Sequence, residues 1–175
     1  MADYRVLVPF ILRWEGGFVD DPLDRGGATN KGVTIGTWKT YCKRVGKQCS
    51  VATLKRMSST EWHEIFKSMF WNRFRADEIV DQSIANILVD WLWASGVHAI
   101  KHCQRIVGVK DDGIVGPKTI AAINGESPLA LFGKLHNDRI KFVEGIVHRN
   151  PKQKKFIRGW KRRINAIHYG SLDME

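Results

Sequence analysis

One stretch of the chain concentrates the side chains that could carry out acid–base chemistry. Residues 14–38 read W-E-G-G-F-V-D-D-P-L-D-R-G-G-A-T-N-K-G-V-T-I-G-T-W, so that one carboxylate, Glu15, ends an apolar run before a segment rich in Gly, Asp and Thr. Trp14 and Phe18 flank Glu15 and can exclude water from it, and the C-terminal end of a preceding helix opposes negative charge. Both effects favour the protonated carboxyl, which is the form that donates a proton to the leaving oxygen of a glycosidic bond.

Candidates for a second carboxylate follow within nine residues. Asp24 stands nine residues after Glu15, just before an R-G-G run, and Asp20 is closer. A small hairpin could carry one of them across a cleft from Glu15, with the hydroxyl of Thr29 or Thr34 positioning a water. Two facing carboxylates, one neutral and one ionised, are the usual equipment of glycoside hydrolysis. The structural alternative is that Glu15 is an exposed helix end and that the aspartates before Pro or Gly are turn residues.

These residues resemble the signature of glycoside hydrolase family 108, the lysozyme-like muramidases of phages and bacteria. That family carries E-G-G-[YF] followed by D-P-x-D-x-G-G-x-T-N-x-G-[IV]-T, and this chain has E-G-G-F at 15–18 and D-P-L-D-R-G-G-A-T-N-K-G-V-T at 21–34. The resemblance implies that Glu15 is the catalytic acid. A looser likeness to phage-type lysozymes implies that Asp24 and Thr29 are its partners, with the other Asp and Thr named above left open.

Aromatic side chains are candidate contacts to the sugar. The chain contains seven Trp, and aromatic rings beyond what packing needs often stack on sugars. Trp71 and Trp91, together with Asp20 and Thr34, are therefore predicted to contact substrate. Trp71 also belongs to an F-W pair followed by A-D-E-I, a combination that resembles family 108. Core packing is the alternative for each tryptophan.

The element before Glu15 is predicted to be an amphipathic helix. Residues 4–14 place apolar side chains at i, i+3, i+4 and i+7, which puts them on one helix face. Asp3 is a suitable N-cap, Pro9 predicts a bend or a late start, and Gly16 with Gly17 predicts a left-handed C-terminal cap. Glu15 is therefore expected in the last helical turn.

The remaining chain is predicted to be mainly α-helical, with one small β-hairpin near residues 19–36, as in a lysozyme-like fold. Ser58 and Glu61 match a capping box. Asp90 lies in an almost wholly apolar segment, so it must find partners, and we expect it to bond to loop backbone. The further helices are predicted over residues 37–45, 51–57, 58–73, 83–95, 97–109, 117–123, 128–148 and 152–169.

A second motif lies in the later half of the chain. The segment D-G-I-V-G-P-K-T at 112–119 resembles the loop-helix signature of small helical peptidoglycan-binding modules. Physically, D-G forms a turn, Gly116 is expected to adopt a conformation awkward for other residues, and Pro117 suits the first position of a helix. We therefore expect a lysozyme-like catalytic part at 1–96 and a peptidoglycan-binding-like part at 97–175, integrated into one globular fold.

The charge of the chain points to an anionic partner. The net charge is +10 and the isoelectric point is near 9.7, which draws the protein towards polyanions. Ten Lys or Arg and a single acid fall between residues 139 and 168, so the predicted C-terminal helix is expected to adsorb to an anionic bacterial envelope, the alternative being a solvated face. The absence of a helix-turn-helix, zinc or RNA-binding motif argues against specific nucleic-acid binding.

The cysteines and the hydropathy of the sequence indicate the cellular compartment in which the protein is made. Cys42, Cys49 and Cys103 leave at least one thiol unpaired, which fits a reducing cytoplasm, although a bridge between the first two is open. No metal or cofactor is expected. The sequence predicts no signal peptide and no membrane span. An enzyme of the cell wall would then need phage-type or dedicated export, and a monomer is expected.

Three functions fit these observations. The leading one is a muramidase that hydrolyses the β-1,4 bond between N-acetylmuramic acid and N-acetylglucosamine. A lytic transglycosylase and a non-catalytic envelope-binding or secretion-assisting protein on a lysozyme scaffold are the alternatives. Inversion or retention would follow from the carboxylate separation, about 6.5–9.5 Å or about 5–5.5 Å.

Overall fold

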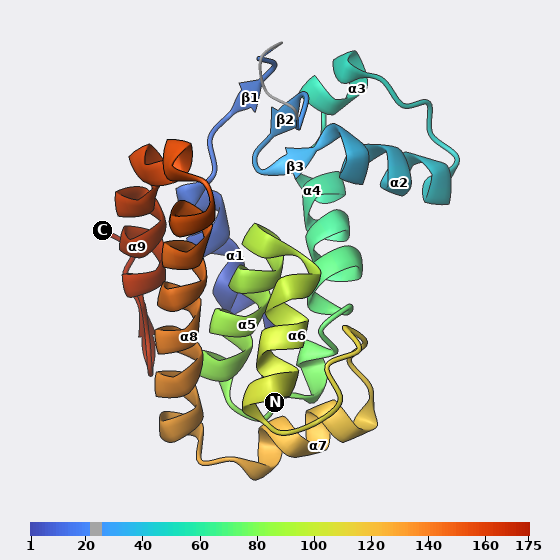
Figure 1. Ribbon diagram of the computed structural model, residues 1–175. Coiled ribbons are helices and arrows are strands. Elements are labelled where there is room, and N and C mark those ends of the chain that lie inside the picture. Colours follow the sequence, from blue (N-terminus) through green and yellow to red (C-terminus); the bar gives the residue numbers. More distant parts are fainter. Residues whose placement is uncertain (22–25) are drawn as a thin grey trace. The chain divides into compact units, whose positions relative to one another are not determined.

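The computed structural model describes residues 1–21 and 26–175 and is mainly α-helical, as predicted (Figure 1). The α-helices are α1 Tyr4–Trp14, α2 Ile35–Val45, α3 Val51–Lys55, α4 Ser59–Phe66, α5 Gln82–Ser95, α6 Val97–Ile106, α7 Pro117–Gly125, α8 Pro128–Arg149 and α9 Ile157–Asn165. A π-helix, η1, spans Lys67–Trp71, and short 3-10 helices are η2 Ala76–Glu78 and η3 Pro151–Phe156. The strands are β1 Phe18–Val19, β2 Thr29–Asn30, β3 Val33–Thr34, β4 Ile167–His168 and β5 Ser171–Leu172.

The chain forms two compact units. The smaller unit is Ile11–Met69, and the larger joins Met1–Phe10 to Phe70–Glu175. The smaller unit carries the predicted acid and the three-stranded sheet, whereas the larger is built from α5 to α9. Each unit has its own set of buried apolar side chains.

Helix α1 forms as its apolar spacing predicts. Leu7, Phe10 and Ile11 are fully buried, and the Asp3 carboxylate caps the helix by accepting a bond of 2.9 Å from the backbone N–H of Arg5. The helix continues through the exposed Pro9. Because α1 already begins at Tyr4, the late start that Pro9 was expected to cause is absent.

The small unit contains the predicted hairpin, extended to three antiparallel strands in the order β1-β2-β3. Lys31 and Gly32 connect β2 to β3 with φ of 47° and 79°, and positive φ at both central residues is the signature of a type I′ turn. The Trp62 indole N–H donates to the Lys31 carbonyl at 2.9 Å, and the buried Asn30 amide donates to the Leu54 carbonyl at 2.9 Å. These bonds attach the turn to α4 and β2 to α3.

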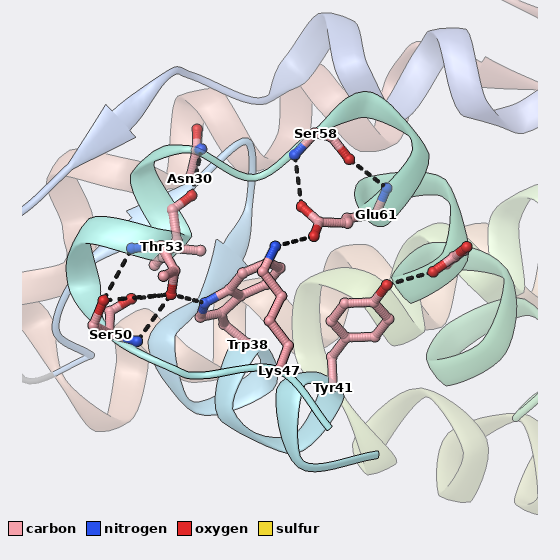
Figure 2. A network of polar contacts seen from close by, with 10 residues as sticks. Asn30, Trp38, Tyr41, Lys47, Ser50, Thr53, Ser58 and Glu61 are labelled. Atoms are coloured by element: carbon pink, nitrogen blue, oxygen red, sulfur yellow. Dashed lines mark hydrogen bonds and ion pairs between the residues drawn. The ribbon is translucent and has the colours of Figure 1, made fainter. Parts of the chain in front are cut away.

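A polar network joins α2, α3 and α4 (Figure 2). The Trp38 indole N–H donates to the Thr53 hydroxyl at 3.0 Å, and Thr53 also forms a capping box with Ser50. The predicted capping box of Ser58 and Glu61 is confirmed. Glu61 accepts in addition from the Lys47 ammonium group, so one carboxylate both caps α4 and binds the loop after α2.

The larger unit is organised around α5, which is buried along most of its length. Helix α5 packs against α6 and α8, and α8 packs against α9 (Figure 1). Asp90 in α5 is fully buried and lies between two guanidinium groups, 2.8 Å from Arg139 of α8 and 2.7 Å from Arg163 of α9. The prediction that Asp90 bonds to loop backbone is therefore wrong, because arginines from two other helices reach it.

A buried glutamine organises the loop between α6 and α7. The Gln104 amide donates to the Ile114 carbonyl at 3.0 Å and to the Asp112 carboxylate at 3.1 Å, and its oxygen accepts from the Gly113 N–H at 2.9 Å. Gly113 has φ of +76°, and a Cβ there would come within 2.7 Å of the Val97 side chain. The glycine that the fold requires is thus Gly113, whereas Gly116, expected to be the unusual one, has φ of −109°.

The chain after Arg149 differs from the predicted continuous helix. Residues 152–169, predicted as one helix, instead form most of the 3-10 helix η3 and then α9, which ends at Asn165. The following residues form the hairpin β4-β5, with Gly170 at φ +91° in its turn. A glycine that adopts a positive φ permits this reversal, which the helical spacing of apolar residues did not indicate.

The helix cap and the ion pair made by Glu61 should contribute separately to the free energy of unfolding. Glu61→Gln keeps an acceptor for the cap but loses the ion pair with Lys47, so we expect the free energy of unfolding to fall by a few tenths to about 1 kcal/mol. Glu61→Ala also loses the cap and should cost about 1 kcal/mol more. Urea unfolding measures both variants.

The ion pair between Glu61 and Lys47 predicts how the free energy of unfolding depends on pH. Burial would raise the pKa of Glu61, but bonds from Lys47 and Ser58 outweigh it and hold the pKa below its usual value. The ionised carboxylate therefore stabilises the fold fully above its unfolded-state pKa of about 4.3, and this contribution is lost as the pH falls through the lower folded-state pKa. The difference between wild type and Glu61→Gln should shrink from about pH 5 to about pH 3. A difference independent of pH would contradict this assignment.

Candidate functional site

Glu15 lies at the junction of α1 and the three-stranded sheet. Helix α1 ends at Trp14, so Glu15 is the first residue after the helix rather than part of its last turn. Neither Gly16 nor Gly17 has a positive φ, so the predicted left-handed cap is wrong. The two glycines instead lead the chain into β1, which leaves the Glu15 side chain half-buried between a helix end and a strand.

The strand register brings the two candidate threonines together. Thr29 in the middle strand β2 is paired with Val19 on one side and with Thr34 on the other. Directly paired residues have Cβ atoms about 4.5–5.5 Å apart. Thr29 thus belongs to the strand that pairs with β1, and β1 begins three residues after Glu15.

Thr34 has a structural role of its own. Its hydroxyl accepts from the backbone N–H of Thr37 at 3.2 Å and lies 3.2 Å from the Thr37 hydroxyl, so it is the N-cap of α2. Gly27, which precedes β2, has φ of +70°, and a Cβ there would lie 3.2 Å from the Ile35 side chain. Because Thr34 holds the start of α2, Thr29 is the hydroxyl of the two that is not committed to a helix cap.

Of the two candidate aspartates, Asp20 belongs to the described residues. Asp20 directly follows β1 and is exposed. Asp24, the predicted second carboxylate, lies outside the described residues. The exposed position of Asp20 at the end of the strand is accessible to a bound molecule, as a substrate contact requires.

The predicted stacking role of Trp71 and Trp91 disagrees with their burial. Both side chains have no exposed surface. The Trp71 indole N–H donates to Asp77 at 2.6 Å, and Trp91 packs against the rings of His102 and Phe142 at 5.2 and 5.7 Å. Both are therefore core residues. A sugar stacks on an open ring face, and neither tryptophan offers one.

Sequence reasoning missed the side chains that hold the candidate site in place. Asn30 and Trp62 hold β2 and the β2–β3 turn, as described above, and Lys55 lies over the Phe18 ring with its ammonium nitrogen 5.5 Å from the ring centroid. The motif T-N-K-G, with its Asn before a Lys-Gly pair, was a usable signal for the turn. The acceptors on Leu54 and Lys31 are backbone carbonyls, which no sequence pattern marks.

The described residues offer neither a metal-binding cluster nor a membrane-spanning helix. They contain no group of three or more His, Cys, Asp or Glu side chains that could hold a metal ion. Within the same residues, no helix combines the length and the apolar character needed to cross a membrane.

Comparison with known proteins gives two sequence matches and a structural one. A model described as "Glycosyl hydrolase 108" matches residues 8–96, and one described as "Predicted Peptidoglycan domain" matches residues 98–165. The solved structure titled "Structure of Brucella abortus SagA" is similar over 94% of this chain and 90% of that chain, with 29% sequence identity and a TM-score of 0.80. No curated protein sequence matches the chain.

The cap assigned to Thr34 predicts the effect of two substitutions. Thr34→Ala removes the acceptor for the Thr37 N–H and should lower the free energy of unfolding by about 1 kcal/mol. Thr34→Ser keeps the hydroxyl and serves as the matched control, with an expected loss below about 0.5 kcal/mol. Chemical denaturation compares the two, and equal losses would show that the hydroxyl does not cap α2.

Proposed function

The chain belongs to the glycosyl hydrolase 108 family, and from this membership we propose that it is an N-acetylmuramidase with Glu15 as its general acid. The family and the peptidoglycan domain at residues 98–165 give the chain a lysozyme-like function related to peptidoglycan. The proposed reaction is hydrolysis of the β-1,4 bond from N-acetylmuramic acid to N-acetylglucosamine. The observation that carries the proposal is the half-buried Glu15 at the end of α1, directly before the sheet.

Glu15 is positioned for proton transfer by rigid elements on both sides. The helix fixes the chain up to Trp14, and the pairing of β1 with β2 fixes it from Phe18 onward. Catalytic groups held by regular elements are more accurately placed than those on free loops. Glu15 protonates the glycosidic oxygen as the bond breaks, and the sugar develops oxocarbenium-like charge.

The remaining roles fall to residues around the sheet. Thr29 positions the attacking water, because its hydroxyl is not the one that caps α2. Asp24 stabilises the positive charge or activates the water, and Asp20 is the alternative for this role. Thr34 supports the site by holding the start of α2, next to Thr29 in the sheet.

The later part of the chain contributes binding to the envelope. Residues 97–175 form the peptidoglycan-binding-like part, in which η3 and α9 expose Lys152, Lys154, Lys155, Arg158 and Arg162. This surface attracts the anionic envelope and concentrates the enzyme on its insoluble substrate. We place its site of action at the cell wall, in the periplasm or outside the cell.

Digestion of purified peptidoglycan tests the proposal. Wild type should release fragments with reducing N-acetylmuramic acid ends, identified by mass spectrometry. Glu15→Gln should lower the rate at least about 100-fold, because general acid catalysis contributes about 10²–10⁴-fold. Glu144→Gln, the same change at an exposed glutamate paired with Lys161, should retain the wild-type rate.

Other products would change the assignment. Fragments ending in 1,6-anhydro sugars would identify a lytic transglycosylase. Sedimentation with peptidoglycan without any release of fragments by wild type would identify a non-catalytic binding protein. Equal rates for wild type and a folded Glu15→Gln variant would remove Glu15 from the mechanism.

Thr29 predicts a second kinetic result. Thr29→Val keeps the shape of the side chain but removes the hydroxyl, so we expect kcat to fall at least about tenfold with little change in KM. Thr29→Ser keeps the hydroxyl and should stay close to wild type. The rates are measured on the same peptidoglycan, and equal kcat values for the two variants would exclude a water-positioning role for Thr29.

A further inference from the structure

A separate cavity lies within the larger unit, where α5, α8 and α9 meet. Its volume is about 230 Å³, which compares with about 30 Å³ for one water in the liquid. The end of α5 contributes Ala94 and Ser95, α8 contributes Arg139 with two aliphatic side chains, and α9 contributes Trp160 and Arg163. The space therefore admits a group much larger than a single water.

The polar wall of the cavity is held in place by Asp90. Arg163 donates Nε and Nη2 to Asp90 Oδ1 at 3.1 and 2.7 Å, and Arg139 Nη2 lies 2.8 Å from Asp90 Oδ2. Burial would raise the pKa of Asp90, but the two arginines outweigh it and hold the pKa below its ordinary value. Asp90 is therefore the anion that fixes both guanidinium groups.

One nitrogen of Arg139 is left without a partner. The Arg139 side chain is only 3% exposed, and its Nη1 is buried with no hydrogen-bond partner among the described residues. Burial lowers the pKa of Arg139, and Asp90 opposes that effect. A buried charged donor without an acceptor is costly, and Arg139 is one of the residues that line the cavity, so an acceptor that enters it and reaches this nitrogen is bound favourably.

The rest of the cavity lining is aromatic and aliphatic. Trp160 is half-buried and stacks on the exposed Phe156, with ring centroids 5.9 Å apart. Val143, Ile146 and Ile164 complete the apolar lining. The Lys155 ammonium nitrogen lies 4.9 Å from the Phe156 ring centroid. An anionic group at the arginines would thus have an apolar or sugar-like body against Trp160.

We infer that this cavity binds a carboxylate group carried by peptidoglycan, with Arg139 Nη1 as a donor and Trp160 against the body of the ligand. The inference rests on the proposed function for the choice of polymer. A guanidinium group is planar and matches the planar carboxylate. Two sources of this chemistry exist in peptidoglycan, the free carboxyl groups of the stem peptide and the lactyl carboxyl of N-acetylmuramic acid that has lost its peptide.

Calorimetric titration of the Glu15→Gln chain with soluble fragments tests the inference without turnover. A tetrasaccharide with stem peptides should bind at least about tenfold more tightly than the same fragment with its carboxyl groups amidated. A fragment without peptides retains only the lactyl carboxylates, and its affinity identifies the source. Equal affinity for the carboxylate and amide fragments would overturn the inference. Binding of inorganic phosphate by a chain that binds neither carboxylate fragment would also overturn it.

A pair of conservative variants locates the effect. Arg139→Lys keeps the charge beside Asp90 but removes the forked donor, and it should weaken binding of the carboxylate fragment about tenfold. Arg73→Lys, the same change at an exposed residue between η1 and η2, should leave that affinity unchanged. Chitotetraose, which has no carboxylate, should bind both variants equally. An unchanged affinity in folded Arg139→Lys would refute the site. If that variant fails to fold, Trp160→Ala removes the aromatic lining instead, and an unchanged affinity in that variant would refute the site.

The outcomes separate this inference from the proposed function. Carboxylate-dependent binding that a variant of the cavity weakens, in a chain that releases no fragments from peptidoglycan, would keep the cavity as a binding site and remove the muramidase assignment. Release of fragments together with carboxylate-independent binding would keep the enzyme and remove the cavity's role.

Discussion

The buried carboxylate of Asp90 is the interaction on which the larger unit depends. It lies on the central helix α5, and its two partners come from α8 and α9, so three helices that are far apart in sequence are fixed by one charged group. Removing one partner of a buried ion pair typically costs about 3–5 kcal/mol, because the other charge remains buried. A buried pair adds less to net stability than its strength suggests, since desolvation opposes it. Its main effect here is to specify which faces of α8 and α9 meet α5.

In the smaller unit, hydrogen bonds from neutral side chains to backbone carbonyls determine how the elements pack. Its strands are each two residues long, too short for their own ladder to define a stable sheet. The Asn30 amide and the Trp62 indole supply the missing constraints from α3 and α4. The strand β2 and the turn that follows it therefore have a defined path, because helices outside the sheet hold them.

Local patterns were sufficient to predict the helices up to α8 and the first hairpin, but neither the β4-β5 hairpin nor the long-range partners. The apolar spacing of α1, the Ser58 and Glu61 capping box, the hairpin and Pro117 at the start of α7 are each determined within a few residues. The partners of Asp90 were not predictable, because they lie 49 and 73 residues away in the sequence. The candidate acid Glu15 was found from its motif, because that motif is also a pattern of residues close together in the sequence. Trp71 and Trp91 were misjudged because burial depends on the whole packing, which residue type alone does not reveal.

The distribution of tryptophan burial has an optical consequence. Four of the seven indoles are fully buried, namely Trp38, Trp62, Trp71 and Trp91. The half-buried indoles are Trp14, Trp93 and Trp160. The emission of the first group reports on folding, whereas a quencher dissolved in water reaches only the second group. Trp14 adjoins Glu15 and Trp160 lines the cavity, so intrinsic fluorescence can distinguish occupation of either place from unfolding of the core without an added label.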